Sequence, residues 1–227
     1  MTALLWKDYR LSRGVLLLGA ALFVGPYAQG CLAALHAHWP GLPPAGDWPA
    51  LLLTASSVSL AMSPLTLLIL AANSIACERA DRSAEFLAYL PPSRLEILVS
   101  KALLVLLAAT LVWAVNLLVA NALVPALGPV PANTVAHLAS WDLLAASAVM
   151  AFGAGWLGSA LCDSPALATC LGIGLSLAVP PMIKLVEVLP WSADDNVRHW
   201  AFFTGLLTLG VAFFVSGSVH YLRRVEP

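Results

Sequence analysis

Apolar residues gather in six long runs along the chain, and short polar segments separate the runs. A helix that crosses a bilayer needs about 20 mostly apolar residues, and each run is long enough. The longest stretch between two runs, residues 78–101, is shorter than the roughly 50 residues of the smallest domains. The pattern therefore predicts one transmembrane domain over residues 1–227. Its spans are expected at about 14–35, 50–77, 102–123, 141–162, 166–189 and 200–222.

Composition agrees with this pattern. Of the 227 residues, 60% are hydrophobic and 10% are charged, and the mean hydropathy is +0.88. Soluble domains are usually about 45–50% apolar and about 25% charged, so this chain cannot cover a globule with polar surface. The net charge of −1 and the scattered basic residues argue against a nucleic-acid partner. We therefore expect an all-α integral membrane protein with six transmembrane helices.

The basic residues predict the orientation of the spans. Loops on the cytoplasmic side of a membrane are enriched in Lys and Arg. With six spans, both termini lie on one side together with segments 78–101 and 163–165, and the opposite side holds only Arg198 and Lys184. We expect a multi-pass protein of the cell (inner) membrane with cytoplasmic N- and C-termini. The basic residues on the expected cytoplasmic side are Lys7, Arg10, Arg13, Arg79, Arg82, Arg94, Lys101, Arg223 and Arg224.

The N-terminal stretch LLWKDYRLSR is amphipathic. Trp6 and its apolar neighbours suit the headgroup region of a bilayer, while Lys7, Arg10 and Arg13 can reach lipid phosphates. We predict an interfacial helix that includes Trp6, Lys7, Asp8 and Arg10. The simpler interpretation is an anchor at the start of the first span. The apolar run that follows is too long for a signal peptide, so we expect it to remain as a span.

The segment between spans two and three carries the densest charge pattern in the chain. Charges of both signs repeat at helical spacing, and an apolar stripe that includes Phe86 and Leu90 lies beside them. The proline pair at 91–92 should stop this helix. Ser93 and Glu96 then form a capping box that begins the next helix. The predicted order is a short amphipathic helix, a stop and a capped helix. The plain alternative is a solvated loop whose charges only fix the topology.

These two polar stretches resemble the permease subunits of ABC-2 type transporters. The resemblance rests on an L-x-K-D-x-R start and an E-R-x-x-x-S-x-E-F-L-x-x-L-P-x-S-R-x-x-I-x-x-S-K segment after the second span. It covers the whole chain, because the family has six spans in this order. The stretch at 80–82 departs from the Lys-Gly-Thr-like sequence of many relatives, and the outer loop between spans five and six is short. The matching residues are Glu78, Arg79, Ser83, Glu85, Phe86, Leu87, Leu90, Pro91, Ser93, Arg94, Ile97, Ser100 and Lys101.

The resemblance implies a transporter subunit that is not itself an enzyme. A separate ATP-binding cassette ATPase would dock at a coupling helix within residues 78–92, and a second permease chain would complete a homo- or heterodimer. ATP and Mg would bind the ATPase, and this chain, which lacks a GxxxxGK[ST] loop, would bind no cofactor. Export is favoured, with the substrate left open. The coupling residues would be Glu78, Arg79, Asp81, Arg82, Glu85, Phe86, Leu90 and Arg94.

Two alternatives to a permease stay open, a non-catalytic membrane scaffold or assembly protein and a membrane-embedded enzyme. An enzyme would need polar residues that converge from several spans, and those in the sequence are scattered. Lys184 and Glu187, spaced i, i+3 in span five, either neutralise each other or mark an outer cavity or gate. The pair Pro180-Pro181 just before them is expected to break span five into two half-helices.

Smaller polar residues in the spans predict helix packing. Asn73, Asn116 and Asn121 are expected to make hydrogen bonds between helices. Small residues at 147, 151, 155 and 159 form an i+4 ladder in span four, which is typical of a packing face. No metal site is expected, because the histidines at 36 and 38 would point in different directions on a helix. The four cysteines form no CxxC pair and lie in or beside apolar runs.

Overall fold

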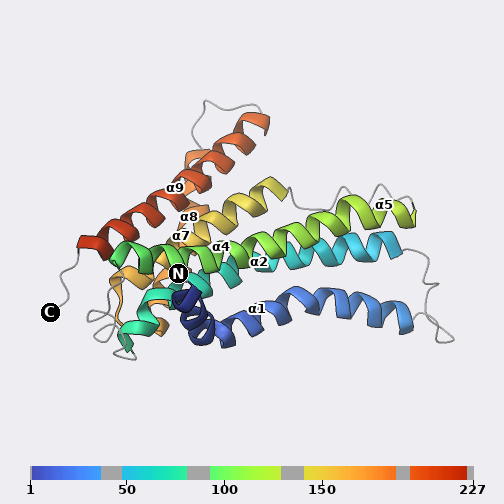
Figure 1. Cartoon of the computed structure of the whole chain (residues 1–227). Coiled ribbons are helices and arrows are strands. Elements are labelled where there is room, and N and C mark those ends of the chain that lie inside the picture. The colour runs from blue at the N-terminus through green and yellow to red at the C-terminus, as the bar shows by residue number, and fades with distance from the viewer. Residues whose placement is uncertain (1, 37–47, 81–92, 129–140, 188–194, 224–227) are drawn as a thin grey trace.

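The computed structural model describes residues 2–36, 48–80, 93–128, 141–187 and 195–223 (Figure 1). These residues are almost entirely helical, and no strand occurs among them. The predicted all-α architecture is therefore confirmed. The elements are α1 (Thr2–His36), α2 (Trp48–Ala80), α4 (Arg94–Leu118), the π-helix η1 (Val119–Leu123), α5 (Val124–Leu127), α7 (Trp141–Leu161), α8 (Pro165–Glu187) and α9 (Asp195–Arg223).

Five helical stretches are long and apolar enough to cross a membrane, which is compatible with a multi-pass membrane protein. Within α8 the apolar stretch is shorter, Pro165–Ala178. The sixth span therefore stays a prediction. The five stretches are Leu5–Leu32, Trp48–Ala80, Arg94–Leu127, Trp141–Leu161 and Asn196–Arg223.

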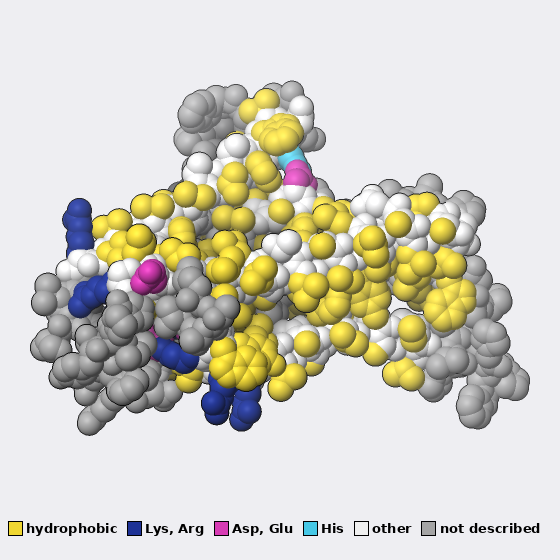
Figure 2. Space-filling view, in the orientation of Figure 1, with side chains coloured by type: hydrophobic (Ala, Val, Ile, Leu, Met, Phe, Trp, Pro, Cys, Tyr) yellow, Lys and Arg dark blue, Asp and Glu magenta, His cyan; other side chains and the backbone are white. Residues whose placement is uncertain are grey.

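Helix α7 forms the centre of the bundle and packs against α2, α8 and α9. In its most apolar window 61% of the residues are buried, against 6% in α1. Helix α1 lies at the edge, along α2 and α4 (Figure 1). The surface is correspondingly apolar: Figure 2 shows hydrophobic side chains over most of the described helices on that face. An apolar exterior is what a bilayer accommodates and water does not.

Glycines allow α7 to approach its neighbours closely. A Cβ atom on Gly153 would lie 2.1 Å from the carbonyl oxygen of Gly210 in α9. One on Gly155 would lie 2.4 Å from the carbonyl oxygen of Leu68 in α2. On the same side, the Ser159 hydroxyl accepts hydrogen bonds from the backbone N–H groups of Ile75 and Ala76, at 2.9 and 3.0 Å. The predicted packing face of span four is thus confirmed at residues 155 and 159.

The start of α4 was also predicted. Ser93 accepts a hydrogen bond from the Glu96 backbone N–H, and the Glu96 carboxylate accepts one from the Ser93 N–H, as a capping box requires. The other end of this helix differs from the prediction, since the helical path passes Pro125 and ends at Leu127. The π-helical turn at Val119–Leu123 ends two residues before that proline. Such a local π adjustment accommodates a residue that cannot donate to the preceding turn.

The predicted break at Pro180-Pro181 is wrong. Helix α8 continues through both prolines to Glu187. Within membranes, neighbouring helices and small local adjustments can satisfy the carbonyl groups that a proline leaves without a donor. Two half-helices are therefore absent from this part of the chain. From residue 179 to 187 the structure describes the helical backbone of α8 but not the side chains. The predicted outer cavity or gate at Lys184 and Glu187 therefore lies outside what the structure describes.

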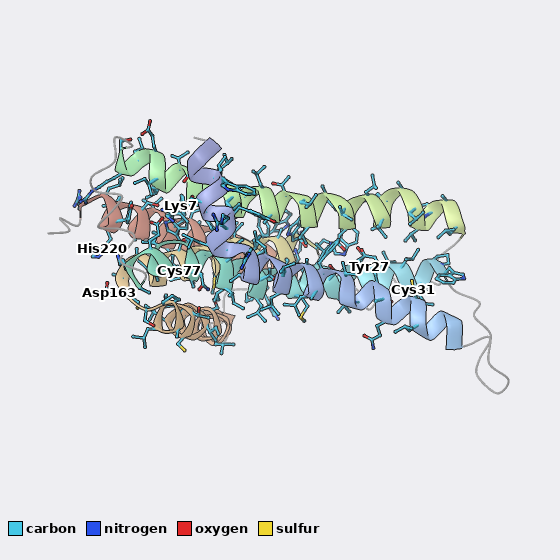
Figure 3. All side chains as sticks on the ribbon, turned by 60° about the horizontal axis from the view of Figure 1, so that its bottom comes forward. Lys7, Tyr27, Cys31, Cys77, Asp163 and His220 are labelled. Atoms are coloured by element: carbon cyan, nitrogen blue, oxygen red, sulfur yellow. The ribbon has the colours of Figure 1, made fainter. Side chains whose placement is uncertain are left out.

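The predicted interfacial helix is continuous with span one in α1, but α1 bends after its first turns (Figures 1 and 3). The segment before the bend runs across one end of the bundle. The rest of α1 runs beside α2. This bend brings the first turns of α1 over the ends of α2 and α4, where the candidate site lies.

Candidate functional site

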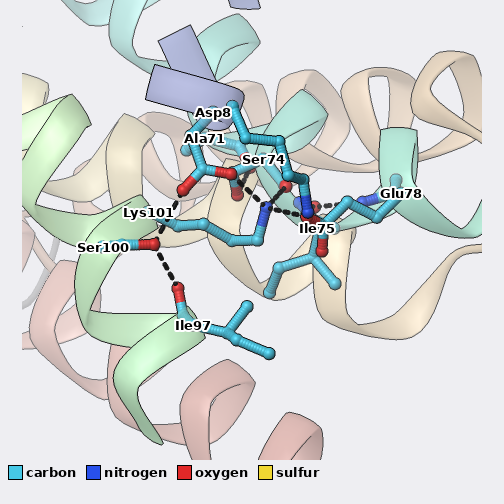
Figure 4. Close-up of polar contacts among 11 residues, drawn as sticks. Asp8, Ala71, Ser74, Ile75, Glu78, Ile97, Ser100 and Lys101 are labelled. Carbon is cyan, nitrogen blue, oxygen red and sulfur yellow. Dashed lines mark hydrogen bonds and ion pairs between the residues drawn. The ribbon is translucent and has the colours of Figure 1, made fainter. Parts of the chain in front are cut away.

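Four charged side chains from three helices meet at one end of the bundle, and we call them the charge cluster: Lys7 and Asp8 of α1, Glu78 of α2 and Lys101 of α4 (Figure 4). The Lys101 ammonium is the centre. Its Nζ lies 3.1 Å from Asp8 Oδ1 and 3.0 Å from Glu78 Oε1. It also donates a 2.7 Å hydrogen bond to the backbone carbonyl of Ser74. All three donor positions of this ammonium therefore have acceptors.

Each carboxylate has a further partner. Asp8 Oδ2 accepts a 2.7 Å hydrogen bond from the Ser100 hydroxyl. Glu78 accepts a hydrogen bond from Lys7, whose side chain is partly exposed. The cluster thus links α1, α2 and α4 through ionic hydrogen bonds, which are about twice as strong as neutral ones.

The burial of the charge cluster determines how strongly it constrains the positions of the helices. Asp8, Glu78 and Lys101 are exposed by only 4%, 3% and 2%. Taking a charge out of water is costly, and a partner of opposite charge offsets that cost only if it stays in place. Two lysines face two carboxylates, so the cluster is formally neutral. It therefore favours one relative position of three helices, because separating them would leave buried charges without partners.

Arg79 fixes the end of α2 on its other side. Its Nη1 donates to the carbonyl oxygens of Ala160 and Cys162, at 3.0 and 3.4 Å, and lies 3.6 Å from Asp163 Oδ1. Ala160 is in the last turn of α7, and Cys162 and Asp163 lie in the connection from α7 to α8. Two adjacent residues thus hold the end of α2: Glu78 binds it to α1 and α4, and Arg79 binds it to α7 and the α7–α8 connection.

The predicted coupling residues are only partly visible. Glu78 is buried in the charge cluster, Arg79 binds the α7–α8 connection, and Arg94 is the exposed first residue of α4. The contacts of Glu78 position α2 and leave it little surface to offer a partner protein. The remaining predicted coupling residues lie outside the described residues: Asp81, Arg82, Glu85, Phe86 and Leu90.

The predicted interfacial residues divide into two groups. Trp6 is 62% exposed, stacks on Tyr9 with ring centroids 5.6 Å apart, and has the exposed Arg10 nearby in sequence. Lys7 and Asp8 instead turn towards the bundle, so Lys7 pairs with Glu78 where the sequence suggested a lipid phosphate. Their ion pairing was not predicted, since Asp8 and Lys101 are 93 residues apart.

A second polar group lies further along the same three helices (the amide cluster: Tyr27, Ser56, Ser59 and Asn116). The Asn116 side-chain oxygen accepts hydrogen bonds from Tyr27 and Ser56, at 2.7 and 3.1 Å, and its amide donates to Ser59 at 3.4 Å. The prediction of bonds between helices is therefore confirmed for Asn116. It is wrong for Asn73 and Asn121, whose amides donate to the carbonyls four residues earlier in their own helices.

Replacing Asn116 with alanine is expected to lower the free energy of unfolding by about 1–2 kcal/mol, because hydrogen bonds between membrane helices contribute roughly 0.6 kcal/mol each. Asn121→Ala in the same helix is the matched control and should have little effect, since that amide bonds only within α4–η1. Thermal unfolding of the purified protein in detergent measures both. Equal melting temperatures for the two variants would contradict a linking role of Asn116.

Between the charge cluster and the amide cluster lies an apolar cavity of about 160 Å³ (the three-helix cavity), lined by α1, α2 and α4. Leu70 borders both this cavity and a small pocket beside Asp8 and Lys101. Ser59 and Val112 line its other end and both accept hydrogen bonds from Asn116. The three helices are therefore joined at two levels, and the cavity lies between these levels.

The described residues contain no cluster of metal-binding side chains. Among them, no three His, Cys, Asp or Glu side chains lie close enough to hold a metal ion. His199 and Asp142 form a contact of 2.5 Å between α9 and α7, at the other end of the bundle from the charge cluster. No protein-family model and no curated protein matches this chain.

Proposed function

We propose that this chain is the transmembrane permease subunit of an ABC-2 type ATP-binding cassette transporter, an exporter driven by a separate ATPase. The ATPase docks at the segment 78–92, and a second permease chain completes the transporter. The observation that carries the proposal is the charge cluster, together with the contacts of Arg79. They surround both ends of the segment that the resemblance identifies as the coupling element.

The mechanical argument follows from where the segment is attached. Its first residues, Glu78 and Arg79, belong to the last turn of α2, which ends at Ala80. Helix α4 begins at Arg94, about two turns before Ser100 and Lys101. A force on the segment acts on helix ends that are bonded to α1, α7 and each other. Packed elements with two discrete arrangements convert such a local displacement into a change of the whole bundle. Substrate access would then change with the ATPase cycle.

In the proposed topology the chain crosses the cell (inner) membrane six times, and both termini lie in the cytoplasm. Figure 3 places Lys7, Cys77, Asp163 and His220 towards one end of the bundle, with Tyr27 and Cys31 nearer the other. On the face in Figure 2, the Lys and Arg side chains also gather towards the end where both termini lie. A single basic end is what the positive-inside rule requires.

A non-catalytic scaffold shares the topology and the charge cluster, and differs only in having no ATPase partner. Purification of the tagged chain from its native membrane in mild detergent, with mass spectrometry of bound proteins, separates the two. A stoichiometric partner with a Walker A loop is the expected result. Recovery of the chain without such a partner in several mild detergents would contradict the permease proposal and favour the scaffold. An embedded enzyme gains no support from the charge cluster, whose members pair with one another.

Reversing two charges in the coupling element, Arg82→Glu with Glu85→Lys, is expected to remove most of the co-purified ATPase. The local net charge is unchanged, so a loss would report on specific contacts with the partner. The matched control reverses Arg223→Glu and Glu226→Lys, which have the same i, i+3 spacing in the C-terminal tail. Quantitative mass spectrometry of the purified complex measures partner stoichiometry, and carbonate extraction verifies insertion. Unchanged stoichiometry in the first variant would locate docking elsewhere.

A further inference from the structure

We propose that the three-helix cavity holds an acyl chain of an anionic phospholipid whose headgroup lies at Arg10 and Arg13. The inference rests on the membrane location proposed above and does not depend on an ATPase partner. It assigns a lipid site inside a single chain, between α1, α2 and α4.

The chemistry of the cavity wall excludes water and favours hydrocarbon. Nearly all of its lining is apolar, from residues such as Val15, Phe23 and Leu67. The hydroxyl groups in the wall are already engaged. Ser63 donates to the Leu60 carbonyl at 2.7 Å, and Thr66 donates to the Met62 carbonyl at 3.2 Å. Ser59 accepts from Asn116. Because water needs two to four polar partners, an apolar cavity of this kind stays dry.

The size and location of the three-helix cavity indicate which ligand it can hold. An engineered protein cavity of about 150 Å³ holds one benzene ring, so this cavity of about 160 Å³ accommodates roughly six carbon atoms. That is a segment of an acyl chain. The cavity lies within the apolar stretches of α1, α2 and α4, each long enough to cross a bilayer. In that location the surrounding solvent is itself made of acyl chains.

The cavity is held open by the bonds at its two ends. The charge cluster fixes α1 to α2 and α4 beyond one end, and the Tyr27–Asn116 hydrogen bond fixes it beyond the other. Between them, Gly19 meets Thr66 so closely that a Cβ atom would lie 2.5 Å from Thr66 Cγ2. Helix α1 therefore cannot close the space without breaking these contacts. A guest that fills it gains dispersion contacts that an empty space forgoes.

The positive charges of Arg10 and Arg13 complement an anionic lipid headgroup. Arg10 and Arg13 are exposed on the turns of α1 that precede the cavity-lining residues Val15 and Leu16. Within the described part of the chain, neither guanidinium is ion-paired, whereas Lys7 on the same helix is. Trp6 and Tyr9 are exposed beside them, as aromatic residues are at the headgroup level of a bilayer. Guanidinium groups at this level can bind a phosphate through bidentate hydrogen bonds.

The test labels the lipid site from within. Purified full-length protein is reconstituted in nanodiscs with phosphatidylglycerol that carries a diazirine in its acyl chain, and labelled residues are mapped by mass spectrometry. Ser63 and Leu67 line the cavity and are exposed by only 4% and 7%, so bulk lipid reaches them poorly. Leu65, which is 42% exposed and does not line the cavity, is the internal reference for bulk lipid. We expect labelling at all three positions.

Ala109→Phe introduces a ring into the cavity wall and should lower labelling of Ser63 and Leu67 by at least about fivefold, since one ring occupies most of such a cavity. Labelling of Leu65 should not change. The matched control is Ala114→Phe on the exposed side of α4, which leaves the cavity as it is. If Ala109→Phe does not yield a monodisperse protein, Val112→Ala replaces it; this variant enlarges the cavity and should raise labelling.

Arg10→Gln with Arg13→Gln tests the headgroup. We expect the preference for phosphatidylglycerol over phosphatidylcholine at Ser63 and Leu67 to fall roughly tenfold, since each basic residue near an anionic surface contributes to binding. Arg223→Gln, at the same end of the bundle, is the control. An unchanged preference would overturn the headgroup assignment.

Two other results would overturn the site itself. One is equal labelling of Ser63 and Leu67 in wild type and in Ala109→Phe, or no response to Val112→Ala. The other is labelling of Leu65 alone. This outcome includes the case in which Leu111 of one chain cross-links to a second copy of the chain, which would then cover the cavity. The ATPase experiment is independent: loss of the partner in Arg82→Glu/Glu85→Lys with unchanged lipid labelling separates the two proposals.

Discussion

Lys101→Met is expected to lower the free energy of unfolding by about 3–5 kcal/mol, the range found when one partner of a buried ion pair is removed. Methionine has a similar length but no charge. The Asp8 and Glu78 carboxylates would remain buried with only Lys7 to balance them. The Ser74 carbonyl would also lose the hydrogen bond that the Lys101 ammonium donates to it. Fluorescence-detected thermal unfolding of the detergent-purified protein measures the effect.

The control for this variant restores the charge balance. In Lys101→Met with Asp8→Asn, the remaining pair is Lys7 and Glu78, which is formally neutral. We expect the double variant to regain at least half of the lost stability, because coupled residues in one network give non-additive effects. A Lys101→Met variant that melts like the wild type would show that water reaches the cluster and would contradict its structural role.

Gly153→Ala is expected to have a comparable effect for a steric reason. The added methyl carbon would lie 2.1 Å from the Gly210 carbonyl oxygen and 2.9 Å from its carbon. Both are backbone atoms, so no change of rotamer relieves the clash, and α7 and α9 would have to separate. Overpacking usually costs about 1–3 kcal/mol and occasionally more; we expect at least about 3 kcal/mol here.

Gly174→Ala is the matched control, since it adds the same methyl group to a helix. A Cβ at Gly174 meets no atom within 4 Å. Alanine is the better helix former, so this variant should be neutral or more stable by up to about 1 kcal/mol. Thermal unfolding and size-exclusion profiles of the two variants give the comparison. Equal behaviour would mean that α7 and α9 are further apart than described.

The sequence predicted the elements that depend on neighbouring residues. The capping box of Ser93 and Glu96, the extent of α7 and its packing face at Gly155 and Ser159 all follow from local spacing. The charge cluster could not be predicted in this way. Lys101 was recognised as a basic residue that contributes to orientation and as part of the permease-like segment, and its pairing with Asp8 depends on how three helices pack.

Proline and asparagine were overinterpreted for a related reason. Prolines 125 and 180–181 were expected to interrupt helices, yet α5 and α8 continue through them. Asn73 and Asn121 were expected to bond to other helices, yet their own backbone carbonyls satisfy them. In each case the residue type is compatible with more than one local structure, and the packing of the neighbouring helices determines which one forms.

The separation in sequence between Asp8 and Lys101 has a consequence for how the protein is made. Ribosomes add about 5–20 residues per second, so the 93 residues between the two partners take on the order of 5–20 s to appear. During that interval the first turns of α1 carry charges that have no buried partner in α4. Until Lys101 is made, the Asp8 carboxylate lacks the ammonium that it pairs with in the folded bundle. The joining of α1 to α4 is therefore a late event of biogenesis, which begins only when Lys101 has left the ribosome, whereas the pairing of Lys7 with Glu78 in α2 can form earlier.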